Sequence, residues 1–388
     1  MAMPASPPDY PAPGAPAHPV LSRGTLGAGR GVPSVLDAGR AVHTVSGRMA
    51  LAHALDRLGV GKGARVLVPA YHCTAIVEPI VQAGAVPVFY RVGRDLAVDV
   101  ADLEARADGA RALLAIHYFG FPQEMARLRA LCDERGIALI EDCAHAFFGL
   151  FDGRPVGTTG DVAIASTWKF FPVQEGGCLI SRAKGPKLRG PGLRYQLKSM
   201  LNAFERAWAT GRLPVLRVIA APAFWLKNRL RDLRKRGAGG AAASSDVPTG
   251  SPKFDESWLH RRASWFTRFV LACANRGRIV RLRRRNYGIL RDGFHGLPHT
   301  AVLFGALPEG VVPYVFPLIV EDERVFDRLK RRGVPIVRFG EFLWEGVDDP
   351  LALEYSRKVL QFPCHQEMTR KELDWIVAEV REAVLKGA

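Results

Sequence analysis

The stretch IALIEDCAHAFF, residues 137–148, decides the fold, because an apolar run leads directly into three polar side chains. The apolar part has the length and composition of a buried strand, and Glu141, Asp142 and His145 follow where that strand ends. Taken alone, an acid at a strand end is most simply a solvated surface residue. In parallel sheets, however, ligands bind beyond the carboxyl ends of the strands, so these side chains are candidates for a site.

A second stretch, DVAIASTWKFFPVQEGG at residues 161–177, has the same organisation, with Ser166 and Lys169 after an apolar strand. Three aromatic residues flank the lysine. They are Trp168, Phe170 and Phe171. Lysine is seldom found among aromatic side chains, because burial penalises its charge. The same burial would lower the pKa of the lysine and make its amine a usable nucleophile.

A third signal is Ser46-Gly47 at the start of a predicted helix in TVSGRMALAHAL, residues 44–55. A helix start presents free backbone N–H groups and a positive dipole end, which together can bind phosphate. A serine at this position is most often only a helix cap. A nucleophilic lysine, a carboxylate and a phosphate cradle at one sheet edge are nevertheless the combination that a pyridoxal 5'-phosphate site needs. The sequence therefore predicts this cofactor and no metal site.

The order of the segments predicts an α/β fold. Short apolar runs alternate with helical patterns from residue 46 to 182, which is typical of a mostly parallel central sheet with helices on both faces. The predicted strands are 65–69, 86–92, 112–118, 137–142, 161–167 and 178–181, and the predicted helices are 46–58, 74–83 and 123–135. Strand, helix, strand and final helix patterns at 314–320, 323–332, 334–339 and 370–386 predict a smaller C-terminal α/β domain.

The predicted domain organisation has three parts. Residues 1–33 are rich in proline and alanine and are expected to be a disordered arm, residues 34–290 a large domain that binds the cofactor, and residues 291–388 a small domain. The large domain contains a basic helical insertion at about residues 184–260.

No secretory signal or spanning helix is predicted. The six cysteines form no CxxC pair, which indicates reduced thiols and a cytoplasmic location.

Five motifs in order resemble the DegT/StrS family of nucleotide-sugar aminotransferases, which are pyridoxal phosphate enzymes of fold type I. The motifs are SGRMAL (46–51), PAYHC (69–73), HYFG (117–120), EDCAH (141–145) and KFFPVQEGG (169–177). Segments of the C-terminal domain also look like the family's closing segments. The resemblance covers roughly residues 40–388, interrupted between about 184 and 260. It implies a PLP-transferase fold of type I with a small C-terminal domain.

The resemblance assigns roles to individual residues. Lys169 matches the catalytic lysine that binds the cofactor covalently and moves the substrate's α-proton. Asp142 matches the acid that pairs with the pyridine nitrogen, and His145 falls near the cofactor's phenolic oxygen. The other predicted cofactor-binding residues are Gly47, Arg48, Ser166, Tyr71 and His72.

Several positions depart from the family pattern. Arg48 replaces the usual threonine or serine and either binds phosphate through its guanidinium group or points away. Cys73 lies where an aromatic ring commonly stacks on the cofactor, so Tyr71 or His72 is expected to take over that contact. His117 belongs to a family motif, and we expect it to be a hydrogen-bonded core histidine at a strand end.

The implied function is the transfer of an amino group from an amino acid, with glutamate the expected donor, to a keto-sugar nucleotide in surface-polysaccharide or aminosugar biosynthesis. A homodimer is expected, because sites of fold type I usually include residues of a second subunit. The nearest alternative is a pyridoxal phosphate-dependent sugar dehydratase, although such relatives typically have histidine where Lys169 stands. A second alternative is a non-enzymatic protein that binds membrane or nucleic acid through its basic stretches, but no known nucleic-acid-binding motif is present.

The formal net charge of +16 is concentrated in two segments. Residues 182–236 hold 15 basic and 2 acidic residues, and residues 261–291 hold 10 basic and no acidic ones, so the rest of the chain is mildly acidic. Helical apolar stripes run through the insertion at 197–208 and 224–236. Such helices either lie peripherally on an anionic membrane surface or pack on protein, which is the more frequent case.

Overall fold

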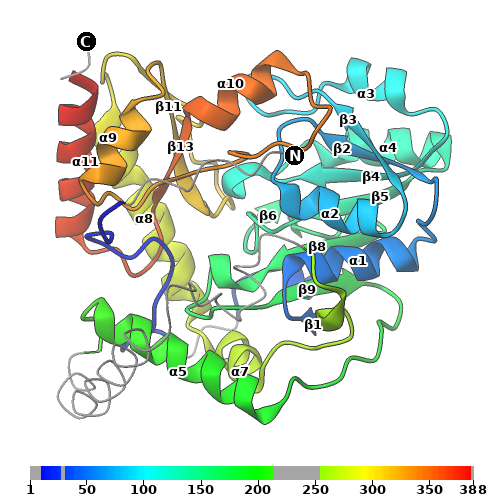
Figure 1. Ribbon diagram of the computed structural model, residues 1–388, viewed down its shortest axis with the longest axis horizontal. Helices are drawn as coiled ribbons and strands as arrows, with labels where there is room; N and C mark the ends of the chain where they lie inside the picture. The colour runs from blue at the N-terminus through cyan, green and yellow to red at the C-terminus, as the bar shows by residue number, and fades with distance from the viewer. Residues whose placement is uncertain (1–9, 28–30, 214–253, 386–388) are drawn as a thin grey trace, which may run out of the picture.

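The computed structural model describes residues 10–27, 31–213 and 254–385. The predicted amphipathic segment 224–236 lies outside these ranges. The described residues form two large sheets, each with its own helices, joined by the long helix α8, Arg276–Phe294 (Figure 1). A third, two-stranded sheet pairs β6 Leu150–Phe151 with β7 Arg154–Pro155.

A seven-stranded sheet in the order β1-β9-β8-β5-β4-β2-β3 forms the centre of the large domain. Its strands are β1 Arg40–Thr44, β2 Arg65–Pro69, β3 Val86–Tyr90, β4 Ala110–Ile116, β5 Ala138–Asp142, β8 Val162–Ser166 and β9 Gly177–Ser181. The run from β8 through β5, β4 and β2 to β3 is parallel, and β9 pairs antiparallel with both β8 and β1. The predicted mostly parallel sheet is therefore confirmed.

The residues of the central strands explain why they are strands. Both β8 and β9 are buried at every position, which requires apolar or small side chains on both faces. Strand β1 has only one fully buried residue, Thr44, and its sequence RAVHT contains no continuous apolar run, so it was not predicted. It lies at the sheet edge, where exposure of one side is tolerated.

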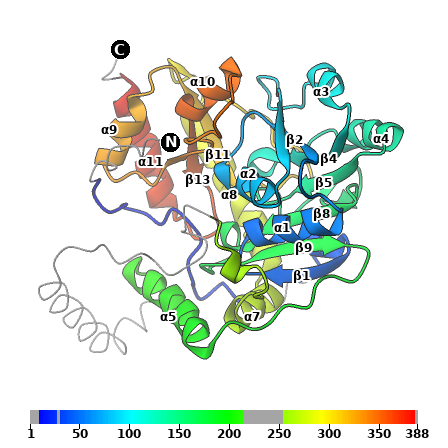
Figure 2. The ribbon, with the colours of Figure 1, turned by 45° about the vertical axis from the view of Figure 1, so that its right-hand side comes forward.

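Helices cover the large sheet, and the predicted ones agree with the structure to within two residues. They are α1 Gly47–Arg57, α2 Thr74–Gln82, α3 Val100–Arg106 and α4 Met125–Arg135, with α3 not predicted. Helix α1 packs on β8, β9 and α2. Two more helices, α5 Leu193–Ala209 and α7 Trp265–Cys273, lie side by side below the sheet (Figures 1 and 2).

The small domain contains a four-stranded antiparallel sheet in the order β10-β11-β13-β12. Its strands are β10 Thr300–Val302, β11 Val315–Val320, β12 Val337–Arg338 and β13 Val359–Pro363, and its helices are α9 Val325–Arg331, α10 Pro350–Lys358 and α11 Arg370–Leu385. The predicted strand 334–339 is reduced to the two residues of β12. Helix α8 packs on α11 and runs through residue 290, so the predicted domain boundary falls inside a helix.

Residues 10–27 are ordered, so the prediction of a disordered arm is wrong for this segment. The N–H of Gly14 donates to the carbonyl of Gly333 in the small domain, and the His18 ring packs edge-on against Trp168 at a centroid distance of 4.7 Å. Val20 and Leu21 are buried. The arm is ordered because it crosses from the small to the large domain and covers apolar surface of both, which composition alone does not reveal.

No helix in the described ranges has both the length and the apolar composition needed to cross a lipid bilayer. None of the six cysteines forms a disulfide.

Candidate active site

The predicted polar residues meet because their strands are parallel neighbours. Ile116 of β4 lies opposite Asp142 of β5, and Asp142 lies opposite Ile164 of β8. Ser166 ends β8, and Lys169 follows in a short 3-10 helix, Thr167–Lys169. The carboxyl ends of these strands therefore bring the side chains to one edge of the sheet, where ligands bind in this class of fold.

A cavity of about 130 Å³ lies at this edge. Six of the predicted site residues line it. They are Gly47, Arg48, Asp142, His145, Ser166 and Lys169. Other lining residues, among them Cys73, Trp168 and Phe339, were not predicted to bind the cofactor. Cys73 ends the motif PAYHC, and Trp168 precedes Lys169 in the stretch 161–177. Phe339 belongs to the small domain, and nothing in the sequence connects it with the cavity.

Lys169 lies at the cavity wall between aromatic rings. Its Nζ is 5.4 Å from the ring centroid of Tyr314 and 5.9 Å from that of Trp168. Burial lowers the pKa of Lys169, and this effect is only partly offset by Cys73 and Asp142 nearby. The lowered pKa favours the neutral amine, as the sequence predicted.

Asp142 is the negative group of the cavity. Burial raises the pKa of Asp142, while Lys169 and a hydrogen bond from the Ala144 N–H to Oδ1, at 2.8 Å, oppose the rise. A buried carboxylate of this kind is stabilised by a positive or protonated neighbour. The cavity thus combines an amine with reduced basicity and a carboxylate that favours a cationic ligand.

His145 is enclosed by aromatic rings. It stacks on Tyr314 and Phe119 at centroid distances of 4.8 Å and 5.7 Å, and Phe339 meets it edge-on at 5.0 Å. Burial, together with nearby Lys169, holds the pKa of His145 well below its ordinary value. The ring is therefore neutral. Its Nδ1 accepts a hydrogen bond from the Phe119 N–H at 3.4 Å, so Nε2 carries the proton and can donate a hydrogen bond without adding charge.

The start of α1 lines the cavity beside the end of β8. Ser46 caps the helix by accepting a hydrogen bond from the Met49 N–H. A Cβ atom on Gly177 of β9 would lie 2.3 Å from the carbonyl carbon and oxygen of Ser46, so only glycine allows this close approach. Gly47 lies beside Ser166 in turn, because a Cβ on Gly47 would be 3.8 Å from the Ser166 Cβ. A helix start and a hydroxyl side chain thus face the same space, as phosphate binding requires.

The Arg48 guanidinium group is engaged by a carboxylate. Its Nε lies 2.7 Å from Oε2 of Glu78 on α2, and both side chains are largely buried. Of the two possibilities that the sequence left open for Arg48, this ion pair favours a side chain directed toward α2. The backbone N–H at position 48 still belongs to the first turn of α1.

Tyr71 and His72 do not lie where the prediction placed them. One of the two was expected to stack on the cofactor. Both are buried, but neither lines the cavity. The Tyr71 ring packs on Tyr118, Phe339 and Tyr355. His72 Nδ1 donates to the Ala70 carbonyl at 2.8 Å, and its Nε2 accepts from the Trp344 N–H at 3.2 Å. The turn after β2 directs these side chains into the interface with the small domain and leaves Cys73 at the cavity.

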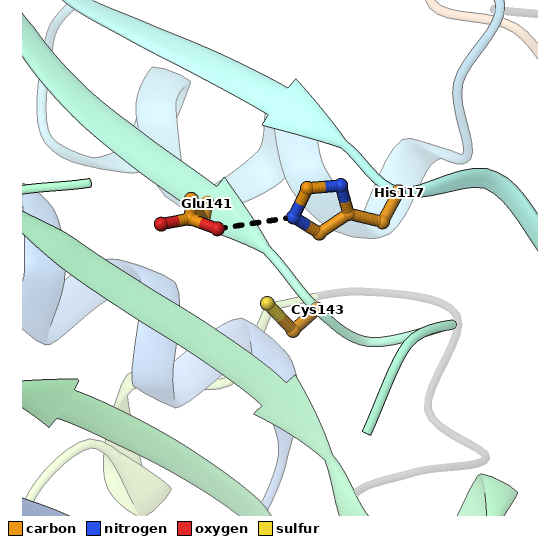
Figure 3. A group of neighbouring side chains, drawn as sticks. All are labelled: His117, Glu141 and Cys143. Atoms are coloured by element: carbon orange, nitrogen blue, oxygen red, sulfur yellow. Dashed lines mark hydrogen bonds and ion pairs between the residues drawn. The ribbon is translucent and has the colours of Figure 1, made fainter. Parts of the chain in front are cut away.

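His117, Glu141 and Cys143 form a buried cluster whose ligand atoms lie within 4.8 Å of one another (Figure 3). His117 Nδ1 accepts a hydrogen bond from the Gln123 N–H at 3.0 Å, so Nε2 carries the proton and donates to Glu141 Oε2 at 3.1 Å. Neither ring nitrogen has a lone pair left for a metal. The expected core histidine describes His117 correctly.

Glu141 has a structural role in the same cluster. Burial raises its pKa, but hydrogen bonds from His117 and from the N–H groups of Gly160 and Thr159 outweigh this and leave the pKa below its ordinary value. The Gly157 N–H also donates to its Oε2. Glu141 thus orders the loop 157–160 behind the sheet, while the adjacent Asp142 faces the cavity.

The fold and cavity place the chain in a known structural class. The structure of Spr1654 from Streptococcus pneumoniae aligns with a TM-score of 0.63 at 17% sequence identity, and the alignment covers 95% of this chain and 100% of that chain. This likeness extends over both domains and establishes the fold.

Part of the sequence matches a known family. Residues 31–190 match the DegT/DnrJ/EryC1/StrS aminotransferase family, in agreement with the motifs in that segment. GDP-perosamine synthase from Vibrio cholerae is 41% identical over 148 residues, which are 36% of this chain and 40% of that protein. UDP-N-acetyl-3-dehydro-alpha-D-glucosamine 3-aminotransferase from Acidithiobacillus ferrooxidans is 37% identical over 133 residues, 34% and 35% of the two chains. This chain therefore spans less than half the length of the curated relatives that it matches.

Proposed function

We propose that this protein is a pyridoxal 5'-phosphate-dependent aminotransferase that transfers an amino group from an amino acid, with glutamate as the expected donor, to a keto-sugar nucleotide. The observation that carries the proposal is that Lys169 and Asp142 line one cavity beside the start of α1. Two relatives named for GDP- and UDP-linked sugars support the substrate class, and Spr1654 was solved in its PLP form.

The cavity residues fit pyridoxal phosphate. Lys169 would hold its aldehyde carbon, Asp142 its pyridine nitrogen, and the first N–H groups of α1, with the Ser166 hydroxyl, its phosphate. The fit rests on the buried amine, on the carboxylate that favours a protonated partner, and on the uncrowded helix start at Gly47. When bound, the cofactor supplies an electron sink for the substrate.

The residues of the chain would bind, orient and move a proton. Lys169 Nζ would take the α-proton of the amino donor and return it, a role that requires a neutral amine and hence a lowered pKa. Asp142 would hold a proton on the ring nitrogen. Phe339 and Trp168 would exclude water from the same space.

The proposal is tested by cofactor loading. Protein incubated with pyridoxal phosphate and reduced with borohydride is expected to carry the cofactor on Lys169 when its peptides are analysed by mass spectrometry. Lys169→Ala should lose the modification, whereas Lys187→Ala, a change at an exposed lysine, should retain it. Absence of the modification in the unaltered protein would contradict the proposal.

A turnover assay separates the proposal from a sugar dehydratase of the same fold. Glutamate should be converted to 2-oxoglutarate in the presence of a keto-sugar nucleotide, in proportion to the amino sugar formed. Loss of water from the sugar nucleotide without consumption of glutamate would favour the dehydratase. A screen of keto-sugar nucleotides would identify the acceptor.

We also propose that the enzyme is a cytoplasmic homodimer, acting in surface-polysaccharide or aminosugar biosynthesis. The support is the family domain at residues 31–190 and the expectation that fold type I sites include residues of a second subunit. Light scattering at micromolar concentration should give twice the chain mass. A monomer with full activity would overturn the dimer.

Helices α5 and α7 together expose a surface of apolar side chains and arginines. Trp265 N–H donates to the Gln196 side chain, which joins the two helices, and Arg261 donates to the Gly190 carbonyl beside them. Five large apolar side chains are exposed here: Leu193, Leu197, Leu201, Trp265 and Phe269. Four exposed arginines accompany them: Arg189, Arg194, Arg261 and Arg262. Apolar side chains rimmed by arginines fit an anionic membrane surface, and we propose peripheral contact there.

Flotation with vesicles tests this contact. The full chain should float with vesicles that contain phosphatidylserine and not with phosphatidylcholine alone, less so at moderate salt. Leu197→Glu with Leu201→Glu should abolish flotation, and Leu353→Glu, at an exposed position of α10, should not. No flotation of the unaltered protein would overturn the proposal. If the double variant instead becomes monomeric, the surface binds a second copy of the chain.

A further inference from the structure

Arg283 of α8 is a fully buried arginine that binds the backbone of the lysine segment. Its Nη2 donates to the carbonyl of Lys169 at 2.7 Å, and its Nη1 donates to the carbonyl of Tyr314 at 2.8 Å. Within the described residues no carboxylate pairs with it, and burial lowers the pKa of Arg283 to about 10. A buried charge satisfied by carbonyl oxygens is rare enough to suggest a specific role.

The carbonyl of Lys169 needs a partner from outside its own segment. Pro172, three residues later, has no N–H, and the Val173 N–H donates to the Phe171 carbonyl at 2.8 Å. The usual local donors are therefore absent or engaged. A largely buried carbonyl left without a donor is costly, so the bond from Arg283 stabilises the backbone at Lys169.

Gln366, in the loop after β13, completes the arrangement. Its Nε2 donates to the carbonyl of Phe170 at 2.9 Å, and its Oε1 accepts from Arg283 Nε at 3.2 Å. Two successive carbonyls of the lysine segment, at 169 and 170, are thus bound by side chains from outside the large sheet. The Arg283 guanidinium also lies 4.4 Å from the Phe170 ring centroid.

The same guanidinium orders both the amine and a ring beside it. Tyr314, whose carbonyl Arg283 binds, has its ring 5.4 Å from Lys169 Nζ and stacks on His145. Displacement of Arg283 would therefore move the lysine backbone and this ring together. Errors of about 1 Å in the position of a reacting group can reduce rates about a hundredfold.

We propose that Arg283, supported by Gln366, is a positioning residue that sets the location and basicity of the Lys169 amine. The catalytic importance of this positioning rests on the proposed function, whereas the hydrogen bonds of Arg283 and Gln366 do not. Arg283→Lys keeps the charge and cannot reach Lys169, Tyr314 and Gln366 together. Arg284→Lys is a matched control, because Arg284 donates to the carbonyls of Pro308 and Val311 and not to the lysine segment.

The test measures the amine itself. In cofactor-free protein, the pH dependence of reductive methylation of Lys169, followed by mass spectrometry, gives the midpoint of its titration. Arg283→Lys is expected to shift this midpoint and to slow covalent capture of pyridoxal phosphate about tenfold or more. Arg284→Lys should leave both unchanged at a comparable loss of thermal stability.

Gln366→Met provides a second variant if Arg283→Lys does not fold. It should shift the titration midpoint of Lys169 in the same direction and slow cofactor capture, both by a smaller amount. Equal midpoints and capture rates in the Arg283, Gln366 and Arg284 variants would overturn the proposal and leave a purely structural role. If the midpoint shifts but the unaltered protein never captures the cofactor, the positioning role holds and the proposed function fails.

Discussion

Arg48 and Glu78 form a largely buried ion pair between α1 and α2, with 2.7 Å between Nε and Oε2. The pair engages the arginine side chain, although Arg48 belongs to the motif at the helix start. In the proposed function, phosphate binding at this end of the cavity would therefore fall to the backbone N–H groups of α1 and to Ser166.

Replacement of Arg48 by threonine tests this division of roles. We expect Arg48→Thr to change the Kd for pyridoxal phosphate by less than about threefold, because the N–H groups of α1 remain. Ser166→Ala should weaken binding more, because it removes a hydroxyl that lines the cavity. Fluorescence titration measures both. A tenfold loss in Arg48→Thr would show that the guanidinium leaves Glu78 when phosphate binds.

Asp142→Asn should separate cofactor capture from catalysis. The amide is nearly isosteric but cannot hold a proton on the ring nitrogen, so we expect turnover to fall about a hundredfold or more while borohydride still fixes the cofactor on Lys169. Steady-state kinetics and mass spectrometry give the two readouts. Unchanged turnover would exclude Asp142 from the role proposed for it.

Gly177→Ala should disturb the contact between β9 and α1. The added Cβ would lie 2.3 Å from the Ser46 carbonyl, and backbone atoms cannot move aside as a flexible side chain can. We expect a loss of about 3 kcal/mol in unfolding free energy and weaker phosphate binding. Gly61→Ala, with no atom within 4 Å of its added Cβ, is the control and should be nearly neutral in urea unfolding.

Acid should destabilise the protein through its buried histidines. Burial lowers the pKa of His72 to about 4, from an ordinary 6.5, although hydrogen bonds to the Ala70 and Pro69 carbonyls oppose the shift. A proton on Nε2 would also break the hydrogen bond that this nitrogen accepts from the Trp344 N–H. The unfolded chain binds this proton first, so stability is lost as pH falls from about 6.5 to 4. This one group accounts for up to about 3 kcal/mol.

The variant His72→Gln should flatten part of this pH dependence. Urea unfolding at several pH values between 7 and 4 is the measurement, and His295→Gln, at an exposed position, is the control. A slope that is the same in both variants would contradict the contribution assigned to His72. Burial lowers the pKa of His145 and His365 as well, so some acid sensitivity should persist.

Sequence patterns were sufficient for the central strands of the large sheet. The strand 65–69 was predicted with the bounds of β2, and β5 and β8 differ from prediction by one residue at most of their ends, because strands buried on both faces are predominantly apolar. Strand β13 of the small domain was not predicted, although it is buried at every position. Strand β1 and helix α3 were missed, since short elements that are exposed on one side carry weaker patterns. The arm at 10–27 was misjudged, because its order depends on surfaces supplied by other segments.

The sequence by itself determined the chemistry of the site, because Lys169, Asp142 and Ser166 each stand at the end of an apolar strand and parallel strands bring their ends to one edge. Only the tertiary structure decided what surrounds them. Phe339, Tyr314 and Arg283 come from segments more than a hundred residues away in the chain, and which of them packs on Lys169 depends on how the small domain meets the large one. Likewise, only the turn after β2 decided that Cys73, and not Tyr71 or His72, faces the cavity.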